Sequence, residues 1–183
     1  IKDIAGNAAT LTLASPGASG SLGANKALVI DGVLPTVTNV TSTTSDGTLK
    51  VGDVAAITLT FSEAVTVSGT PQLTLSTGSS NAVVDYTSGS GGTTLTFNYT
   101  VASGHVSSDL DYAATNSLAL NGGTINDANG NAATLTLASP GASGSLGANK
   151  ALVIDGVVPT VTNVTSTTSN GMLKIEDVAA ITV

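Results

Sequence analysis

The clearest pattern along the chain is an alternation of apolar and polar residues with a period of two. Residues 57–61 and 95–101 place Ile, Leu, Phe, Tyr or Val at every second position, with Thr or Asn between them. Such a period sends successive side chains to opposite faces of a β-strand, so both segments are predicted to be half-buried strands. Shorter segments of similar character predict further strands at Thr36–Thr41, Gln72–Ser76, Ala82–Thr87, about Tyr112 to Leu120, Ala133–Ala138 and Ala151–Ile154.

Turn signals separate these segments. Asp46-Gly47, Asn121-Gly122 and Asn129-Gly130 are turn dipeptides, and residues 89–92 form a flexible Gly/Ser loop. No segment has apolar residues at helical spacing over a length that would predict a helix in place of these strands. Seven or so short strands within one unit predict an all-β fold, a β-sandwich. A parallel β-solenoid is the rival fold, but it requires a much shorter repeat than this chain contains.

The chain repeats itself with a period of 124 residues. Residues 1–59 match residues 125–183 except at Lys2/Asn126, Ile4/Ala128, Ala5/Asn129, Leu34/Val158, Asp46/Asn170, Thr48/Met172, Val51/Ile175, Gly52/Glu176 and Leu59/Val183. We therefore expect 1–32 to be the C-terminal part of a preceding repeat, 33–156 a complete repeat, and 157–183 the N-terminal part of the following one. The end segments are expected to become ordered only when strands from another chain, or from further parts of the same array, complete them. Identical subunits that supplied those strands would polymerise by β-augmentation.

Composition narrows the classes of partner. Hydrophobic residues make up 41% of the chain, enough for a core, and the longest apolar runs are too short to predict a transmembrane helix. The five cations are all lysines, arginine and cysteine are absent, and the net charge is −7. Nucleic acid is thereby disfavoured as a partner, and insertion into a membrane is not expected. Binding of cations by carboxylates remains as a candidate function, and an acidic surface suits hard cations such as calcium.

A Gly/Ala/Ser-rich segment occurs twice, at residues 15–26 and again at 139–150. It is predicted to be a surface loop without a following helix. A phosphate-binding loop would need Gly-Lys followed by Ser or Thr, whereas Lys26 follows Asn25 and precedes Ala27.

Four motifs of the complete repeat are familiar as a set: Phe61–Val65, Asp109–Tyr112, Asp127–Asn131 and Val153–Thr160. Together they resemble the tandem bacterial immunoglobulin-like, cadherin-like repeats of giant secreted adhesins and surface filaments. The resemblance implies an immunoglobulin-like sandwich that acts as a rigid, extracellular extender unit at the cell surface. It also implies neighbouring repeats or identical subunits as partners, and calcium at the domain junctions.

The order of the strands predicts where the carboxylates gather. With strands running alternately up and down, the second strand ends and the last strand begins at the pole where the chain enters the domain. This pole is expected to collect Glu63, Asp127, Asn129 and the incoming linker residue Asp31, and the opposite pole Asp53, Asp109, Asp111 and the outgoing linker residue Asp155. Calcium takes about six to eight oxygen ligands, and both groups are candidate sites. Plain turn chemistry is the alternative, since Asp and Asn before Gly are ordinary turn residues.

No catalytic arrangement is indicated, and the protein is not expected to be an enzyme. His105 is the only histidine and is interpreted as a loop residue. An isopeptide crosslink between Lys and Asn side chains is chemically available, but the sequence favours no particular pair of residues for it. The alternative function is a ligand-binding repeat that contacts a surface glycan or ice through rows of threonine (Thr58/Thr60, Thr94/Thr96, Thr134/Thr136), or an S-layer-type surface protein. Rows on one flat, exposed face would favour the ligand-binding function.

Overall fold

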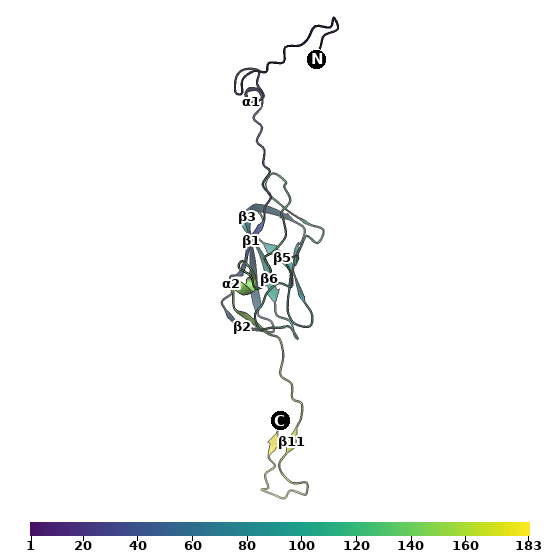
Figure 1. Ribbon diagram of the computed structural model, residues 1–183. Helices are drawn as coiled ribbons and strands as arrows, with labels where there is room; N and C mark the ends of the chain where they lie inside the picture. Colours follow the sequence, from purple (N-terminus) through teal and green to yellow (C-terminus); the bar gives the residue numbers. More distant parts are fainter. The chain divides into compact units, whose positions relative to one another are not determined.

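The computed structural model describes residues 1–183, and the chain divides into two compact units, Ile1–Val33 and Leu34–Val183. The first unit contains one short helix, α1 (Leu22–Asn25), and no strand. Ser21 is the only buried residue before Asp31. All but two of the strands, and every buried apolar residue, belong to residues 34–156 of the second unit (Figure 1).

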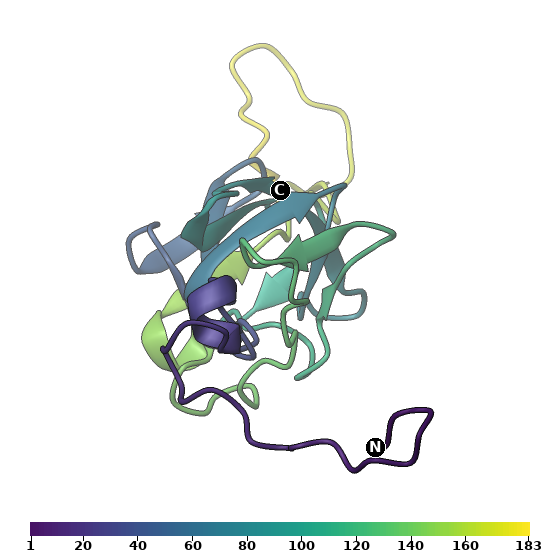
Figure 2. The same cartoon turned by 90° about the horizontal axis from the view of Figure 1, so that it is seen from above.

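The main sheet is built around β3, a strand of 15 residues (Val54–Ser68). Its first half pairs antiparallel with β1 and β6, and its second half pairs antiparallel with β9. The pairing with β6 shifts in register between Thr60 and Val65. Seen from above, the strands of this unit curl around a common interior (Figure 2). The sheet order is β1 (Val37–Ser42), β3, β6 (Gly92–Thr100), β5 (Ala82–Ser88), β4 (Gln72–Leu75) and β8 (Leu118–Ala119), with β9 (Thr124–Asn126) added on β3.

A smaller sheet contains the last strand of the repeat. β10 (Leu152–Asp155) lies between β2 (Gly47–Lys50) and β7 (Val106–Ser107). It pairs antiparallel with β7 but parallel with β2. The expectation of strictly alternating strand directions is therefore wrong at this edge, because the last strand joins the sheet beside an early strand that runs in the same direction.

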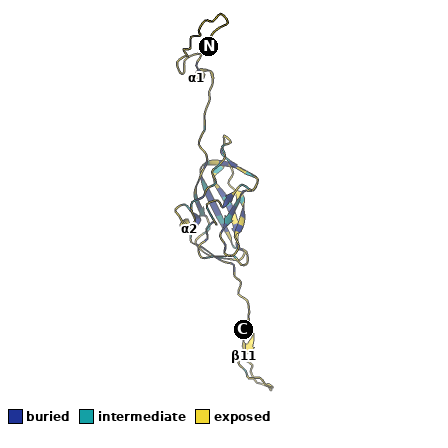
Figure 3. Ribbon diagram, turned by 45° about the vertical axis from the view of Figure 1, so that its right-hand side comes forward, coloured by how far each residue is buried: buried dark blue, intermediate teal, exposed yellow.

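The interior is apolar and aliphatic, with a few aromatic rings. Alternate residues of β3 and β6 face inward, as the period of two predicts, while the intervening threonines face the other side. Buried residues gather in this unit (dark blue in Figure 3). The largest fully buried side chains are Tyr99, Tyr112, Phe97, Ile57, Leu59, Leu73, Leu75, Leu95, Leu110, Ile125, Leu146 and Leu152. The fold is thus an all-β immunoglobulin-like sandwich, as predicted.

Three sequence-based predictions need correction. Residues 133–138 form no strand, only an isolated parallel bridge between Thr36 and Thr134. The segment from Tyr112 to Leu120 contains only the two-residue strand β8. The segment 139–150 is not a plain surface loop, because it contains the helix α2 (Leu146–Asn149), with Leu146 and its N-cap Ser145 both fully buried. Packing against the rest of the sandwich decides which segments pair as strands and that Leu146 is buried, and a local pattern does not encode either outcome.

The end segments have no core of their own. Residues 157–183 contain no buried residue, and their only regular structure is the pair β11 (Thr165–Ser166) and β12 (Ile181–Thr182). This pair repeats the register of β1 and β3, with Thr165 opposite Thr182 where Thr41 is opposite Thr58. Division of the chain into one complete and two partial repeats stays a prediction.

Candidate cation-binding site

Two carboxylates meet where β3 and β9 end their pairing. Thr66 of β3 lies opposite Asn126 of β9 in an antiparallel ladder. Counting back along β3 therefore brings Glu63 level with the turn that follows Asn126. The carboxylates of Glu63 and Asp127 offer oxygens within 4.8 Å of each other. The two residues therefore lie at the same pole of the sandwich, and their role as metal ligands stays a prediction.

A tight turn holds Asp127. Its Oδ1 accepts the backbone N–H groups of Asn129 and Asn131, each at 2.8 Å, and its Oδ2 accepts the side-chain amide of Asn131 at 2.7 Å. Burial raises the pKa of Asp127. Hydrogen bonds from Asn131, Asn129 and Gly130 outweigh this effect and hold the pKa below the ordinary value of 3.8. The carboxylate is therefore ionised at neutral pH although only 6% of the residue is exposed.

Glu63 differs from Asp127 in its hydrogen bonding. Its Oε1 is buried and has no hydrogen-bond partner in the protein. A buried oxygen without a partner is costly, and the cost is greater beside a second carboxylate, because like charges repel in a poorly solvated site. A cation between the two side chains would satisfy the oxygen and offset the repulsion. The oxygen-only donor set is the one that calcium prefers.

The chain enters the sandwich beside this site. Thr36 exchanges two hydrogen bonds with Ser62, the neighbour of Glu63. Asp31 belongs to the other unit and lies five residues before Thr36 in the chain. Its Oδ1 accepts the N–H of Val33 at 3.1 Å, as the Oδ1 of Asp155 accepts the N–H of Val157. Covalent connection alone keeps Asp31 within roughly 17 Å of Thr36.

The second predicted group of carboxylates is not gathered into one cluster. Asp53 is half-buried, and its carboxylate accepts hydrogen bonds from the Nζ and the backbone N–H of Lys50. Asp111 accepts the N–H groups of Tyr112 and Gly141. A Cβ at Gly147 would lie 3.0 Å from Asp111 Oδ2 and 3.4 Å from Asp109 Oδ2, so these two carboxylates flank α2. No group of three metal-ligating side chains forms around Asp53, Asp109, Asp111 or Asp155.

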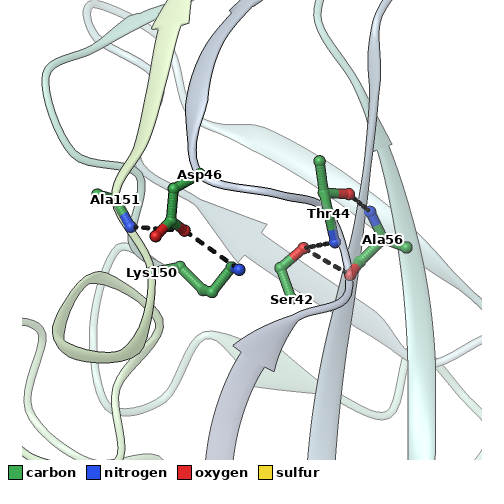
Figure 4. Close-up of polar contacts among 6 residues, drawn as sticks. All are labelled: Ser42, Thr44, Asp46, Ala56, Lys150 and Ala151. Carbon is green, nitrogen blue, oxygen red and sulfur yellow. Dashed lines mark hydrogen bonds and ion pairs between the residues drawn. The ribbon is translucent and has the colours of Figure 1, made fainter.

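The sequence does not predict an ion pair that joins the segment before β10 to the connection between β1 and β2. Lys150 Nζ lies 3.1 Å from Asp46 Oδ1, and the same carboxylate accepts the N–H of Ala151 at 3.3 Å (Figure 4). The hydrogen bond from Lys150 is the main reason why the pKa of Asp46 is lowered. The two residues are 104 positions apart, so only the fold brings them together.

A second network lies beside this pair. Ser42 Oγ donates to the carbonyl of Ala56 and accepts the N–H of Thr44, whose own hydroxyl accepts the N–H of Ala56 (Figure 4). These hydrogen bonds hold the end of β1 and the residues that follow it against Ala56 of β3. The same contacts recur in the last segment among Ser166, Thr168 and Ala180.

His105 has a structural environment. It follows β6 in a short loop, where its ring stacks on Tyr99 with 5.8 Å between centroids and its Nδ1 lies 3.0 Å from the Tyr99 hydroxyl. The N–H of Ala102 also points to Nδ1. These contacts fit the interpretation of His105 as a loop residue.

The threonine rows lie partly on one face. Thr41, Thr58 and Thr96 are aligned across β1, β3 and β6, and Thr60 is aligned with Thr94. However, Thr58 at the centre is only 8% exposed, and Thr134 and Thr136 lie outside the strands. The rows therefore do not form the fully exposed array that ligand binding would require.

The fold agrees with a match to a known protein family. Residues 31–140, more than half of the chain, match the family model described as bacterial Ig-like domain. The protein belongs to this family, whose domains are generally non-enzymatic, structural or adhesion-type, and typically occur in surface or extracellular proteins. No curated protein and no solved structure matches the chain. No helix has both the length and the apolar character needed to span a membrane.

Proposed function

We propose that the chain is a structural repeat of an extracellular bacterial adhesin or filament, in which the sandwich acts as an extender unit. The observation that carries this proposal is the near-identical second copy of residues 1–59 within a chain that belongs to the bacterial Ig-like family. An array of like domains gains length by repeating one interface, without a new contact at each step. The partners are then neighbouring repeats or identical subunits, at the cell surface.

A calcium ion is proposed as the stiffening element at the pole where the chain enters the sandwich. Glu63 and Asp127 are the proposed side-chain ligands, with Asp31 of the linker and Asn129 as further oxygen donors. The buried, unpartnered Oε1 of Glu63 beside the buried carboxylate of Asp127 supports this site. An ion bound jointly by linker and domain residues would restrict the motion of one domain against the next.

The calcium proposal has a direct test. Thermal unfolding of the 183-residue chain is measured with calcium and with a chelator, for the wild-type chain, Glu63→Gln and Glu176→Gln. A ligand that binds only the folded state adds about 2.7 kcal/mol at a hundredfold excess over Kd. Wild type and Glu176→Gln should both gain this stability with calcium, because Glu176 is exposed and lies outside the sandwich. Glu63→Gln should lose the gain.

The apo proteins provide the control. In chelator, Glu63→Gln should unfold no earlier than wild type, because the substitution removes a charge that has a carboxylate neighbour. Equal midpoints for the wild-type chain with calcium and with chelator would reject the site and leave Asp127 as a turn residue.

A further inference from the structure

β5 and β6 form an incomplete strand pair. They lie side by side (Figure 1), but they pair only where residues 86–88 of β5 meet residues 96–97 of β6. Residues 82–85 of β5 pair only with β4, and residues 98–100 of β6 pair only with β3. The pairing of the two strands therefore stops partway along, and it leaves a fork between them.

A groove of about 750 Å³ lies in this fork. Its volume falls within the range of about 300–1,000 Å³ that is typical of ligand sites. The exposed residues Val83, Asp85 and Thr87 line it from β5, and the exposed residues Asn98 and Thr100 line it from β6. No residue of the candidate cation site lines this groove, so the two sites are separate.

The backbone of β5 directs unpaired hydrogen-bonding groups toward the groove. In an antiparallel ladder, successive residues direct their N–H and C=O groups to opposite sides of the strand. The N–H of Tyr86 bonds to Pro71 O at 2.8 Å, so Tyr86 and, two residues earlier, Val84 face the side of β4. Val83 and Asp85 therefore face the groove, where no strand pairs with them.

β6 presents a second edge to the same groove. The N–H of Val101, the residue after β6, bonds to Asp53 O on the side of β3 at 2.9 Å. By the same alternation, Asn98 and Thr100 face the groove, and no strand pairs with them there. The N–H of Asn98 already bonds to Thr87 Oγ1 at 3.3 Å. β5 is therefore the edge with more free backbone groups.

A free strand edge is suited to an extended peptide, because its N–H and C=O groups match those of an added strand. In antiparallel pairing, directly opposite side chains share one face and lie about 4.5–5.5 Å apart. A cationic peptide residue fits opposite Asp85, and an aliphatic residue two positions later fits opposite Val83, whose side chain is 58% exposed.

Charge favours a partner other than this chain. Asp85 Oδ1 accepts the side-chain amide of Gln72 at 2.9 Å, and no lysine lines the groove to neutralise the carboxylate. A second copy of the chain, with a net charge of −7, is disfavoured as the occupant because like charges repel.

We propose that the groove between β5 and β6 binds an extended, basic segment of another protein by strand addition to β5. A lysine or arginine of that segment lies beside Asp85, and an aliphatic residue lies beside Val83. This recognition site is additional to the proposed extender role, and it lies on the sandwich itself.

The test is an NMR titration of the 183-residue chain with a synthetic peptide, in chelator, so that the calcium proposal is not involved. The probe is a blocked heptapeptide of threonine with lysine at its third position and valine at its fifth. Binding should slow the exchange of the Val83 and Asp85 amide protons with water, because strand addition gives both of them carbonyl partners. A peptide with methylated backbone nitrogens at its lysine and valine should not bind, since it lacks the matching N–H donors.

Charge variants separate the side-chain contact from the backbone pairing. Glutamate in place of the peptide's lysine should weaken binding about fivefold, because like charges then lie directly opposite each other. Asp85→Lys should reverse this preference. Asp85→Asn, which keeps an acceptor for Gln72, should remove it. Glu176→Gln, an exposed change outside the sandwich, should leave both affinities as in wild type.

Three results would overturn the proposal: no binding at millimolar peptide, binding without slower exchange at Val83 and Asp85, or an affinity that ignores the charge at position 85. A neutral trisaccharide such as maltotriose is titrated in parallel. Resonance shifts around the groove with the sugar and none with the peptide would assign the groove to a carbohydrate, and they would equally overturn strand addition.

Discussion

Residues 6–32 and 130–156 have the same sequence and different fates, which separates local from tertiary causes of structure. Both copies form the four-residue helix with a serine cap, and both place Asn hydrogen bonds on the preceding Asp, Asp3 or Asp127. Only the second copy forms a strand, β10, and only the second buries its leucines. Caps and turns thus need partners within four residues, whereas a strand needs a neighbour from elsewhere in the chain.

The largest expected effect tests the burial difference directly. Leu146→Ala should reduce the free energy of unfolding of the sandwich by about 2–5 kcal/mol, because it removes a fully buried side chain and leaves a cavity. Leu22→Ala, the same change in the first copy, should alter it by less than about 0.5 kcal/mol. Urea unfolding of the two variants provides the measurement. Comparable losses in both would show that the first copy is also packed in solution.

The helix caps sharpen the comparison, since the same bond forms in both copies. Ser145→Ala should cost about 1 kcal/mol of sandwich stability, as expected for the loss of an N-cap. Ser21→Ala removes an equivalent cap, but it should leave the unfolding transition unchanged because α1 contributes no buried apolar residue. A shift of the transition by Ser21→Ala would contradict this separation.

Tyr112 reports whether the second copy is docked. Burial, with a contribution from Asp111, raises the pKa of Tyr112 to about 12, and burial raises that of Tyr99 to about 12. Since both folded pKa values exceed the ordinary 10, the stability gained from the neutral rings is complete below pH 10 and is lost as pH rises toward 12. Tyr112→Phe should cost about 1 kcal/mol by removing the bond to Ala138, and ultraviolet titration should show one fewer late-titrating tyrosine.

The smallest expected effect concerns the pH dependence of stability that Asp3 and Asp127 contribute. Hydrogen bonds from Asn7 lower the pKa of Asp3, and those from Asn131 and the turn backbone lower that of Asp127 against the effect of burial. A lowered pKa adds stability above the ordinary value of 3.8 that is lost as pH falls through the folded pKa. Asp127→Asn should therefore flatten the acid limb of the stability profile in chelator, and Asp3→Asn should not. Equal changes would place Asp3 in the cooperative unit.

Much of the site could be predicted because one strand length and one turn determine it. Counting strands predicts Glu63 and Asp127 at one pole, and their carboxylates do lie close together, although β3 continues beyond Glu63 to Ser68. The Asp-x-Asn-Gly-Asn motif predicts a turn, but it does not by itself predict that the side chain of Asn131 holds Asp127. The repeat of Asp and Asn at the same spacing is the sequence feature that indicates this role, because Asn7 donates the equivalent hydrogen bond to Asp3 in the first copy.

By itself, the sequence determined the period-two strands, the turns, the serine-capped helices and the duplication, because the interactions that form them join residues a few positions apart. Tertiary structure alone decided that β10 runs parallel to β2, that Lys150 meets Asp46, and that Leu146 is buried while Leu22 is exposed. The physical reason is that burial and strand pairing need a second surface. Identical residues acquire a core position only where the rest of the sandwich stands beside them.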